Sequence, residues 1–380
     1  MSATIRFSDG RGGPFYRAVR TRVDEYFAKA GKSRYATTAL WVKVALYFTA
    51  VVTSYGLILS GRFGPWTMLA LANIFGVSTL LLAINAGHDG AHAALSRHRW
   101  INQAVLYFSF SLIGADPYLW QFRHLRSHHV FPNVNGCDID IDSNWLLRLS
   151  PNHPKRWYHR YQHLYAPFVF WLVDIHTVFI QDLFYLFKRN LANMVDIRHP
   201  ASAYVSFVLC KAAYLLIVFV IPMLLLPVPW WQVLIGVLAM SFVASSLFVY
   251  LLIGTHFAEE TQFPEIDANG VIAGDWATHA MLTALDWNTK SRIAHFIGGG
   301  ANSHAAHHLF PNISHAHYPK ITPIVEETAA EFGVPYHVTT LPRMIRSHFR
   351  FLKRVGVADG NGPTAPIPAV QRRLPASAIC

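Results

Sequence analysis

Charged side chains are scarce in this chain of 380 residues: Asp, Glu, Lys and Arg make up 14% of it, whereas hydrophobic residues make up 53%. A soluble domain carries about a quarter charged residues. The shortage therefore argues against a soluble protein. It favours one integral membrane unit over the two or three soluble domains, roughly, that this length would otherwise allow.

Acidic residues are fewer than basic ones, and cysteines are few. The chain has 21 Asp and Glu against 32 Lys and Arg, which gives a net charge of +11 with histidines neutral. In a membrane protein this excess is typical of cytoplasmic loops, and it attracts anionic lipid headgroups or an acidic redox partner. The basic residues do not gather in one motif, which argues against nucleic-acid binding. Cys137, Cys210 and Cys380 form no CxxC pair and predict no disulfide framework.

Long and predominantly apolar runs predict the membrane spans. A helix needs about 20 residues to cross a bilayer. The runs that fit are residues 38–60, 66–87, 203–226 and 230–254. Two further apolar stretches, 101–115 and 164–187, are short or interrupted by polar residues, and we expect helices that lie in the interface or against the bundle. The expected fold is therefore an all-α integral membrane protein with four transmembrane helices, interfacial helices and a cytosolic cap.

The distribution of cations predicts the orientation. The connections at 61–65 and 227–229 hold one cation between them, so the opposite side should be cytoplasmic. Residues 1–37 are hydrophilic and basic, and we expect a cytoplasmic arm that precedes a membrane domain at 38–345. Residues 346–380, which are rich in Pro and Ala toward the end, are interpreted as a partly disordered tail.

Eight histidines fall into three clusters beside the apolar runs. They are His88 and His92; His124, His128 and His129; and His304, His307 and His308. Spacings of three and four residues put imidazoles on one face of a helix. Neutral imidazole is the commonest protein ligand for transition metals, and eight imidazoles are too many for one four-coordinate zinc. They suit two iron atoms, which indicates oxygen-dependent chemistry on an apolar substrate.

Histidines outside the clusters receive separate interpretations. His279 lies on an expected helix before the third cluster, and we predict that it is a ninth ligand. His256 ends a membrane run, where a polar cap is unsurprising, and we favour a structural role for it. His315 and His317 are interpreted as ordinary hydrogen-bonding or surface residues.

Acidic and amide side chains near the clusters are candidates for orienting the ligand imidazoles. Asp89 lies inside the first cluster, and Asn302 shortly precedes the third. Asp138 alternates with Asp140 and Asp142 in a loop after the second cluster. This loop lacks the glycine and the distal glutamate of an EF-hand, so we interpret its aspartates as loop structure or as acceptors for imidazole N–H groups.

These clusters resemble the histidine boxes of the membrane fatty acid desaturase superfamily. The resemblance covers roughly residues 40–340 and includes GGGANSHAAHHLFPNISH at 298–315 and RYQHLYA at 160–166. It is strongest to the acyl-lipid and front-end branch, although that branch usually has Gln where this chain has His304. The resemblance implies a diiron centre with nine histidine ligands in a cap over four transmembrane helices. His279 best matches the ligand outside the three boxes.

The resemblance also implies a reaction and its partners. Two non-heme Fe ions, with O2 as co-substrate, would introduce a cis double bond into a fatty acyl chain carried by lipid, coenzyme A or acyl carrier protein. The chain shows no His-Pro-Gly-Gly haem motif, so electrons are expected from a separate ferredoxin or cytochrome b5. The site would face the cytoplasm.

Two alternatives to desaturation remain open. An acetylenase or a hydroxylase could use the same scaffold, because a few pocket residues decide between these outcomes. A membrane metal transporter is the alternative from another class. It would place ionisable residues inside the spans, whereas 66–87 and 212–254 hold no charged residue.

Overall fold

The computed structural model describes residues 5–141 and 145–358 of the chain. Helices dominate this part, and its strands are two-residue segments that form two parallel pairs. The pairs are β1 (Arg6–Phe7) with β2 (Val271–Ile272), and β3 (Asp286–Trp287) with β4 (Val338–Thr339). The all-α class expected from the sequence is therefore confirmed.

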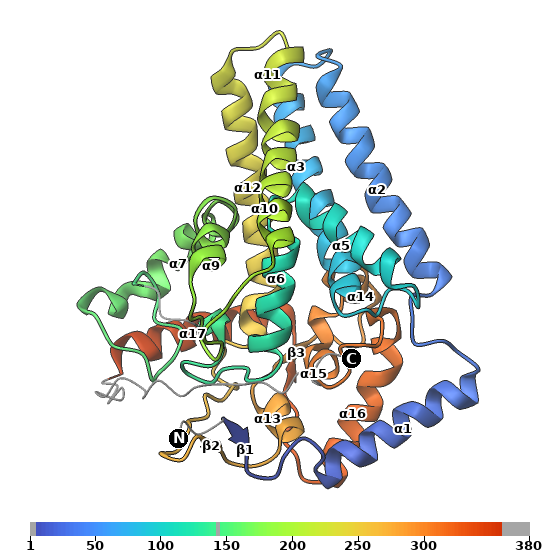
Figure 1. Ribbon diagram of the computed structural model, residues 1–380, viewed down its shortest axis with the longest axis vertical. Coiled ribbons are helices and arrows are strands. Elements are labelled where there is room, and N and C mark those ends of the chain that lie inside the picture. Colours follow the sequence, from blue (N-terminus) through green and yellow to red (C-terminus); the bar gives the residue numbers. More distant parts are fainter. Residues whose placement is uncertain (1–4, 142–144, 359–380) are drawn as a thin grey trace.

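Four helices in the described part are long and apolar enough to cross a membrane. They are α2 (Thr38–Leu59); α3 (Pro65–Leu82) with η1 (Ala83–Gly87) and α4 (His88–Ala91); α10 (Ala201–Leu215) with η6 (Leu216–Val220) and α11 (Ile221–Leu225); and α12 (Trp230–Leu252) with η7 (Ile253–Thr255). They agree with the predicted spans apart from small shifts at the ends. Together they form a narrow stalk that rises from a wider cap (Figure 1).

Close packing holds the stalk together, and its outer surface is apolar. α3 lies against both α2 and α12. Gly76 allows the approach of α12, because a Cβ at this position would lie 2.8 Å from Met240 Cβ. Leu46 and Leu209 point away from the bundle, with 55% and 64% of their surface exposed. Such a continuous apolar exterior is typical of a surface covered by lipid.

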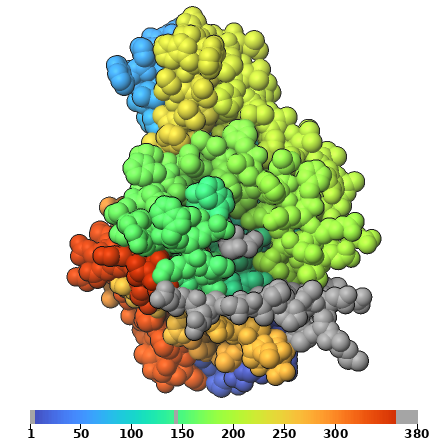
Figure 2. Space-filling model, turned by 90° about the vertical axis from the view of Figure 1, so that its left-hand side faces the viewer, coloured from blue at the N-terminus to red at the C-terminus, as the bar shows by residue number. Residues whose placement is uncertain are grey.

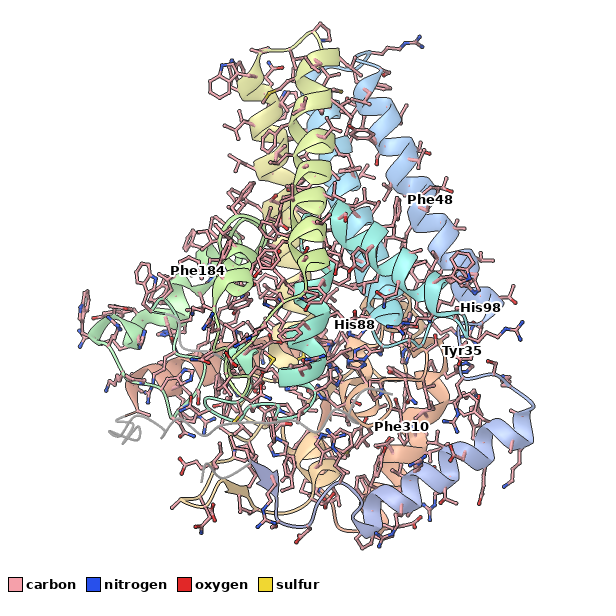
Figure 3. The ribbon with its side chains drawn as sticks, in the orientation of Figure 1. Tyr35, Phe48, His88, His98, Phe184 and Phe310 are labelled. Atoms are coloured by element: carbon pink, nitrogen blue, oxygen red, sulfur yellow. The ribbon has the colours of Figure 1, made fainter. Side chains whose placement is uncertain are left out.

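Shorter helices surround the foot of the stalk. They are α5 (Arg99–Leu112), α6 (Pro117–Arg123), and a bent arm of η4 (Trp157–Tyr161), α7 (Gln162–Phe170), α8 (Val173–His176), η5 (Thr177–Gln181) and α9 (Asp182–Phe187). The arm turns by 77° after Phe170, and by length and composition it also qualifies as one broken span. Phe184 lies on the outer edge of the arm (Figure 3) and is 58% exposed. These helices lie against the bundle, as the two interrupted apolar stretches predicted.

Segments from both ends of the chain build the cap. Its helices are α1 (Pro14–Ala30), η3 (Ile139–Ile141), α13 (Trp276–Leu282), α14 (Arg292–Gly298), η8 (Ala301–Ser303), α15 (His304–Leu309), η9 (His315–His317), α16 (Tyr318–Glu331) and α17 (Leu341–Val357). Phe15, Val19 and Val23 of α1 share one buried core with Ile321 and Val325 of α16. The N-terminal segment is therefore folded into the cap rather than separate from it, because its apolar residues recur at four-residue spacing along one helical face.

The C-terminal boundary also differs from the expectation. We expected the folded domain to end at residue 345, but α17 continues to Val357. Met344, Phe351 and Leu352 are buried on its inner face, so this helix belongs to the folded domain. The disorder predicted for the end of the tail falls on residues 359–380, which lie outside the described residues.

Candidate metal centre

Three elements that are distant in the sequence bring the histidine clusters to the foot of the stalk. The first cluster follows the π-helical turn η1 at the end of a membrane span. The second lies on η2 (His124–His128), a π-helical turn that continues α6. The third lies on α15 in the cap. Single π-helical turns are frequent at functional sites, because they reorient side chains within a continuous helix.

Four histidines form a first group in which all ligand nitrogens lie within 4.8 Å of one another: His88, His92, His124 and His307. The Nε2 atoms of His92 and His124 are 3.1 Å apart. His88 lies where the stalk meets the cap (Figure 3) and is partly exposed. The group thus combines all three clusters.

A second group, with the same 4.8 Å limit, consists of His128, His256, His304 and His308. The Nε2 atom of His256 lies 2.6 Å from that of His304 and 3.0 Å from that of His308, and the last two are 3.2 Å apart. Hydrogen bonds cannot account for all three contacts, because each needs one nitrogen with a proton and one without, and among three nitrogens at least two are alike. Metal–imidazole bonds of about 2.1 Å around one ion bring nitrogens this close together.

His129 lies between the two groups. Its Nε2 atom is 3.0 Å from His124 Nε2 of the first group. Its ring centroid lies 4.7 Å from that of His307 and 4.6 Å from that of His308, one from each group. All eight histidines of the three clusters are therefore brought to one place.

The structure brings His256, and not His279, to the second group. A carbonyl can only accept, so the contact of His256 Nδ1 with Thr283 O at 2.8 Å makes Nδ1 the donor and leaves Nε2 free to bind a metal. His279 instead uses Nε2 to donate to Pro132 O at 2.8 Å and lies edge-on against Phe7. The sequence signal for His256 was its position at the cap end of a charge-free span, which corresponds to the position of His88.

Burial keeps these imidazoles in the neutral form that binds metals. It lowers the pKa of seven of them well below the usual value, and the neighbouring imidazoles generally lower it further: His92, His124, His129, His256, His304, His307 and His308. His128 differs from them. Burial also opposes its charged form, but Asp138 and Asp140 outweigh this effect and raise its pKa.

Asp138 orients a histidine of the second group. Its carboxylate lies 3.2 Å from His128 Nδ1 and is itself fixed by the backbone N–H groups of Asn133 and Asp140. Asp140 lies 3.5 Å from the same nitrogen and pairs with Arg123 at 2.9 Å. Such carboxylates fix the ring orientation and the tautomer of a ligand imidazole. Asp142 lies outside the described residues.

Asp89 and Asn302 contact histidines outside the two groups. Asp89 accepts from Ser314 Oγ at 2.7 Å and lies 3.0 Å from His315 Nδ1. The other ring nitrogen of His315 lies 3.0 Å from Lys43 Nζ, so His315 belongs to a buried polar network. Asn302 lies 3.2 Å from His295 Nδ1. These two side chains fix the polypeptide around the first and third clusters rather than the ligand rings.

The donor set fits two transition-metal ions. His307 Nε2 is buried without a hydrogen-bond partner in the described part of the chain and belongs to the first group. Imidazole donors suit iron, zinc, copper or nickel, whereas Mg2+ and Ca2+ prefer oxygen ligands. The residues present can therefore hold two ions with four histidines each, and His129 lies close to both sites.

Comparison with known proteins shows that the chain is similar in sequence to fatty acid desaturases. The family model described as fatty acid desaturase matches residues 64–340. The chain is 30% identical to the sn-1 linoleoyl-lipid 6-desaturase of Arthrospira platensis over 94% of this chain and 96% of that protein. It is 27% identical to the acyl-lipid (8-3)-desaturase of Physcomitrium patens over 94% and 75%, respectively. It is 30% identical to the acyl-lipid (8-3)-desaturase of Mortierella alpina over 90% and 78%.

Proposed function

Because this chain belongs to the fatty acid desaturase family and acts on fatty acyl chains, we propose that it uses O2 and two iron ions to introduce a cis double bond. The observation that carries this proposal is the convergence of nine imidazoles, from the three clusters and His256, at the foot of the stalk. When bound there, two iron ions and O2 would supply the oxidising power to remove hydrogens from two adjacent methylene groups, which side-chain acids and bases lack.

The residues of the chain would hold and orient the metals. Four histidines would hold each ion, and His256 replaces His279 in our proposed ligand set. Thr283 O fixes the tautomer of His256, and Asp138 fixes the ring of His128. Burial excludes water from most of the ligands, which protects a reactive site from side reactions.

The acyl chain would approach on the side of His88, which is partly exposed. Trp120 stacks on His124 with ring centroids 4.3 Å apart and lies 5.7 Å from His88. Phe110 packs on Trp120 with centroids 4.6 Å apart. These rings make an apolar wall beside the first group, and methylene groups prefer such a surface to water.

The names of the relatives favour a lipid-linked substrate. Two of them are acyl-lipid desaturases and a third is a linoleoyl-lipid desaturase. We therefore favour a membrane lipid over coenzyme A or acyl carrier protein as the carrier of the acyl chain. A separate ferredoxin or cytochrome b5 would supply the electrons from the cytoplasmic side.

The test is expression in a host that lacks the activity, followed by mass spectrometry of its fatty acid methyl esters. We expect a product that has lost two hydrogens, and about two irons per purified chain on the proposed stoichiometry. The variant His307→Ala should form no product while the protein remains in the membrane. Gain of oxygen would identify a hydroxylase, and loss of four hydrogens an acetylenase. Either result would contradict our proposal.

A further inference from the structure

The outer face of α17 carries cations without ionic partners. Arg343, Arg346, Arg350 and Lys353 are exposed, and α17 contains no acidic residue. None of the four forms an ion pair among residues 5–141 and 145–358. Like charges so close together repel one another. An anion that covers this face therefore lowers the electrostatic free energy of the protein.

The neighbouring segment extends the same charge. α17 packs against η4, and Gly356 lies so close to His159 O that a Cβ would clash with it. The chain from Trp145 to Val173, which includes η4, also lacks Asp and Glu. We call the combined face the α17–η4 surface. The exposed cations considered for this surface are Arg156, Arg160, Arg343, Arg346, Arg350, Lys353 and Arg354.

An exposed aromatic and aliphatic belt adjoins these cations. Trp145 and Trp157 are 66% and 78% exposed, and Leu164 and Phe168 of α7 are 63% and 59% exposed. α7 and α17 lie one above the other where the stalk widens into the cap (Figure 1). Figure 2 shows the same order from the side, with the red segment directly below the green one. Exposed tryptophans flanked by Lys and Arg are typical of the membrane–water interface.

The inner face of α17 contacts the metal-binding segment. His348 Nδ1 donates to Phe257 O at 2.7 Å, and Phe257 follows the proposed ligand His256. Glu259 N donates to Ser347 Oγ at 3.0 Å. A Cβ at Gly254 would lie 2.5 Å from Met344 Cγ, so the two segments are in tight contact. A ligand that fixes α17 would therefore also fix the chain around His256.

We propose that the α17–η4 surface binds the phosphodiester headgroups of anionic phospholipids. Seven exposed cations, on or directly beside two elements that contain no acidic residue, supply charge complementarity, and the adjoining aromatic belt supplies the insertion into the bilayer. An acidic protein would be attracted by the cations, but the exposed belt would leave it with a large apolar surface to cover. This inference is independent of the proposed oxidation chemistry.

The test uses the full chain, purified in a neutral detergent and titrated with phosphatidylglycerol or phosphatidylcholine, with bound lipid counted by native mass spectrometry. Each surface cation contributes roughly fivefold to binding of anionic lipid at low salt. The variant Arg346→Gln/Arg350→Gln/Lys353→Gln should therefore bind phosphatidylglycerol on the order of 100-fold more weakly. Its binding of phosphatidylcholine should not change.

Two controls keep the result interpretable. Arg20→Gln/Lys29→Gln/Lys32→Gln removes the same charge from exposed positions of the cap and should bind phosphatidylglycerol like the wild type. Arg346→Lys/Arg350→Lys keeps the charge and should also bind. The melting temperature without added lipid should be equal in all variants.

Equal retention of both lipids by the wild type, or unchanged phosphatidylglycerol binding by the Gln variant, would overturn the proposal. So would a Gln variant that keeps the lipid but loses the binding of soluble cytochrome b5, because the surface would then serve an acidic protein.

Discussion

The role of a histidine in this protein depends on which of its two ring nitrogens is already occupied. His256 and His279 lie within a few residues of apolar helix ends, and both donate to a backbone carbonyl. His256 does so through Nδ1 and presents Nε2 to two other imidazoles. His279 donates through Nε2 and is removed from both groups. A proton donated to a carbonyl cannot be replaced by a metal without loss of that hydrogen bond.

At this scale we predict opposite effects for the two histidines. His256→Ala should remove one proposed ligand and lower the iron content and the product by more than tenfold. His279→Ala should leave both irons in place but lower the free energy of unfolding by about 1–3 kcal/mol, because Pro132 O loses its buried donor. Iron analysis and thermal unfolding in detergent measure both effects. Full iron in His256→Ala together with loss of iron in His279→Ala would restore the assignment made from the sequence.

At the scale of elements, α6 is the support of the second cluster. Asp116 caps its first turn by accepting from Leu119 N at 2.7 Å, and the helix continues directly into η2. Asp182 of α9 accepts from Asp116 N at 2.7 Å and also from Lys211 of α10 at 2.7 Å. One buried ion pair therefore connects a membrane helix and the bent arm to the helix that carries His124.

We predict that Lys211→Met destabilises the protein strongly. Asp182 is 1% exposed, so removal of its partner leaves a buried carboxylate without a counter-charge, at a cost of about 3–5 kcal/mol. Lys211→Arg should keep most of the stability. Lys211→Met/Asp182→Asn should recover much of the loss, since no charge remains unpaired. Thermal unfolding in detergent measures all three variants, and a Lys211→Met protein as stable as the wild type would exclude this role.

Asp116 predicts a pH dependence of stability. Burial raises its pKa from 3.8 to about 6. Between pH 4 and 6 the unfolded chain therefore releases this proton while the folded protein keeps it, so this group lowers stability as the pH rises, by up to about 3 kcal/mol. Asp116→Asn keeps an acceptor for Leu119 N but cannot titrate. As the pH rises from 4 to 6, we expect the melting temperature of this variant to increase relative to that of the wild type. A constant difference would contradict the pKa shift.

For the whole molecule, the two helical hairpins of the stalk put the candidate metal ligands at one end. Each hairpin starts at the cap, turns at the far end of the stalk and returns to the cap (Figure 1). His88 and His256 lie at the cap ends of the second and fourth spans. The third cluster meets them because α15 belongs to the cap itself. The stalk therefore holds the site at the boundary between lipid and cap.

We predict that labelling of single cysteines will separate the two ends of the molecule. Arg62→Cys lies in the connection at the far end of the stalk, and Lys32→Cys lies in the cap. In intact cells, a membrane-impermeant maleimide should react with the first variant only, because the cap faces the cytoplasm in our proposal. After permeabilisation both should react. Cys137 and Cys210 are buried and should stay unlabelled, and Cys380→Ser removes the remaining thiol. Reaction of Lys32→Cys in intact cells would reverse the orientation.

Patterns of local sequence determined the spans and the three clusters. An apolar run of about 20 residues with at most one charge is long enough to cross a bilayer, and histidines spaced by three or four residues share a helical face wherever that helix packs. These features depend on neighbours in the sequence, so the fold class and the candidate ligands His88, His128 and His307 could be predicted from the sequence.

Contacts between distant segments decided the rest. The choice of His256 over His279 depends on the carbonyls of Thr283 and Pro132, which only the packing of the cap brings to these rings. The inclusion of α1 and α17 in the cap depends likewise on buried faces that find partners far along the chain. Hydrogen bonds and burial between remote residues leave no local pattern, and therefore the tertiary structure alone determines them.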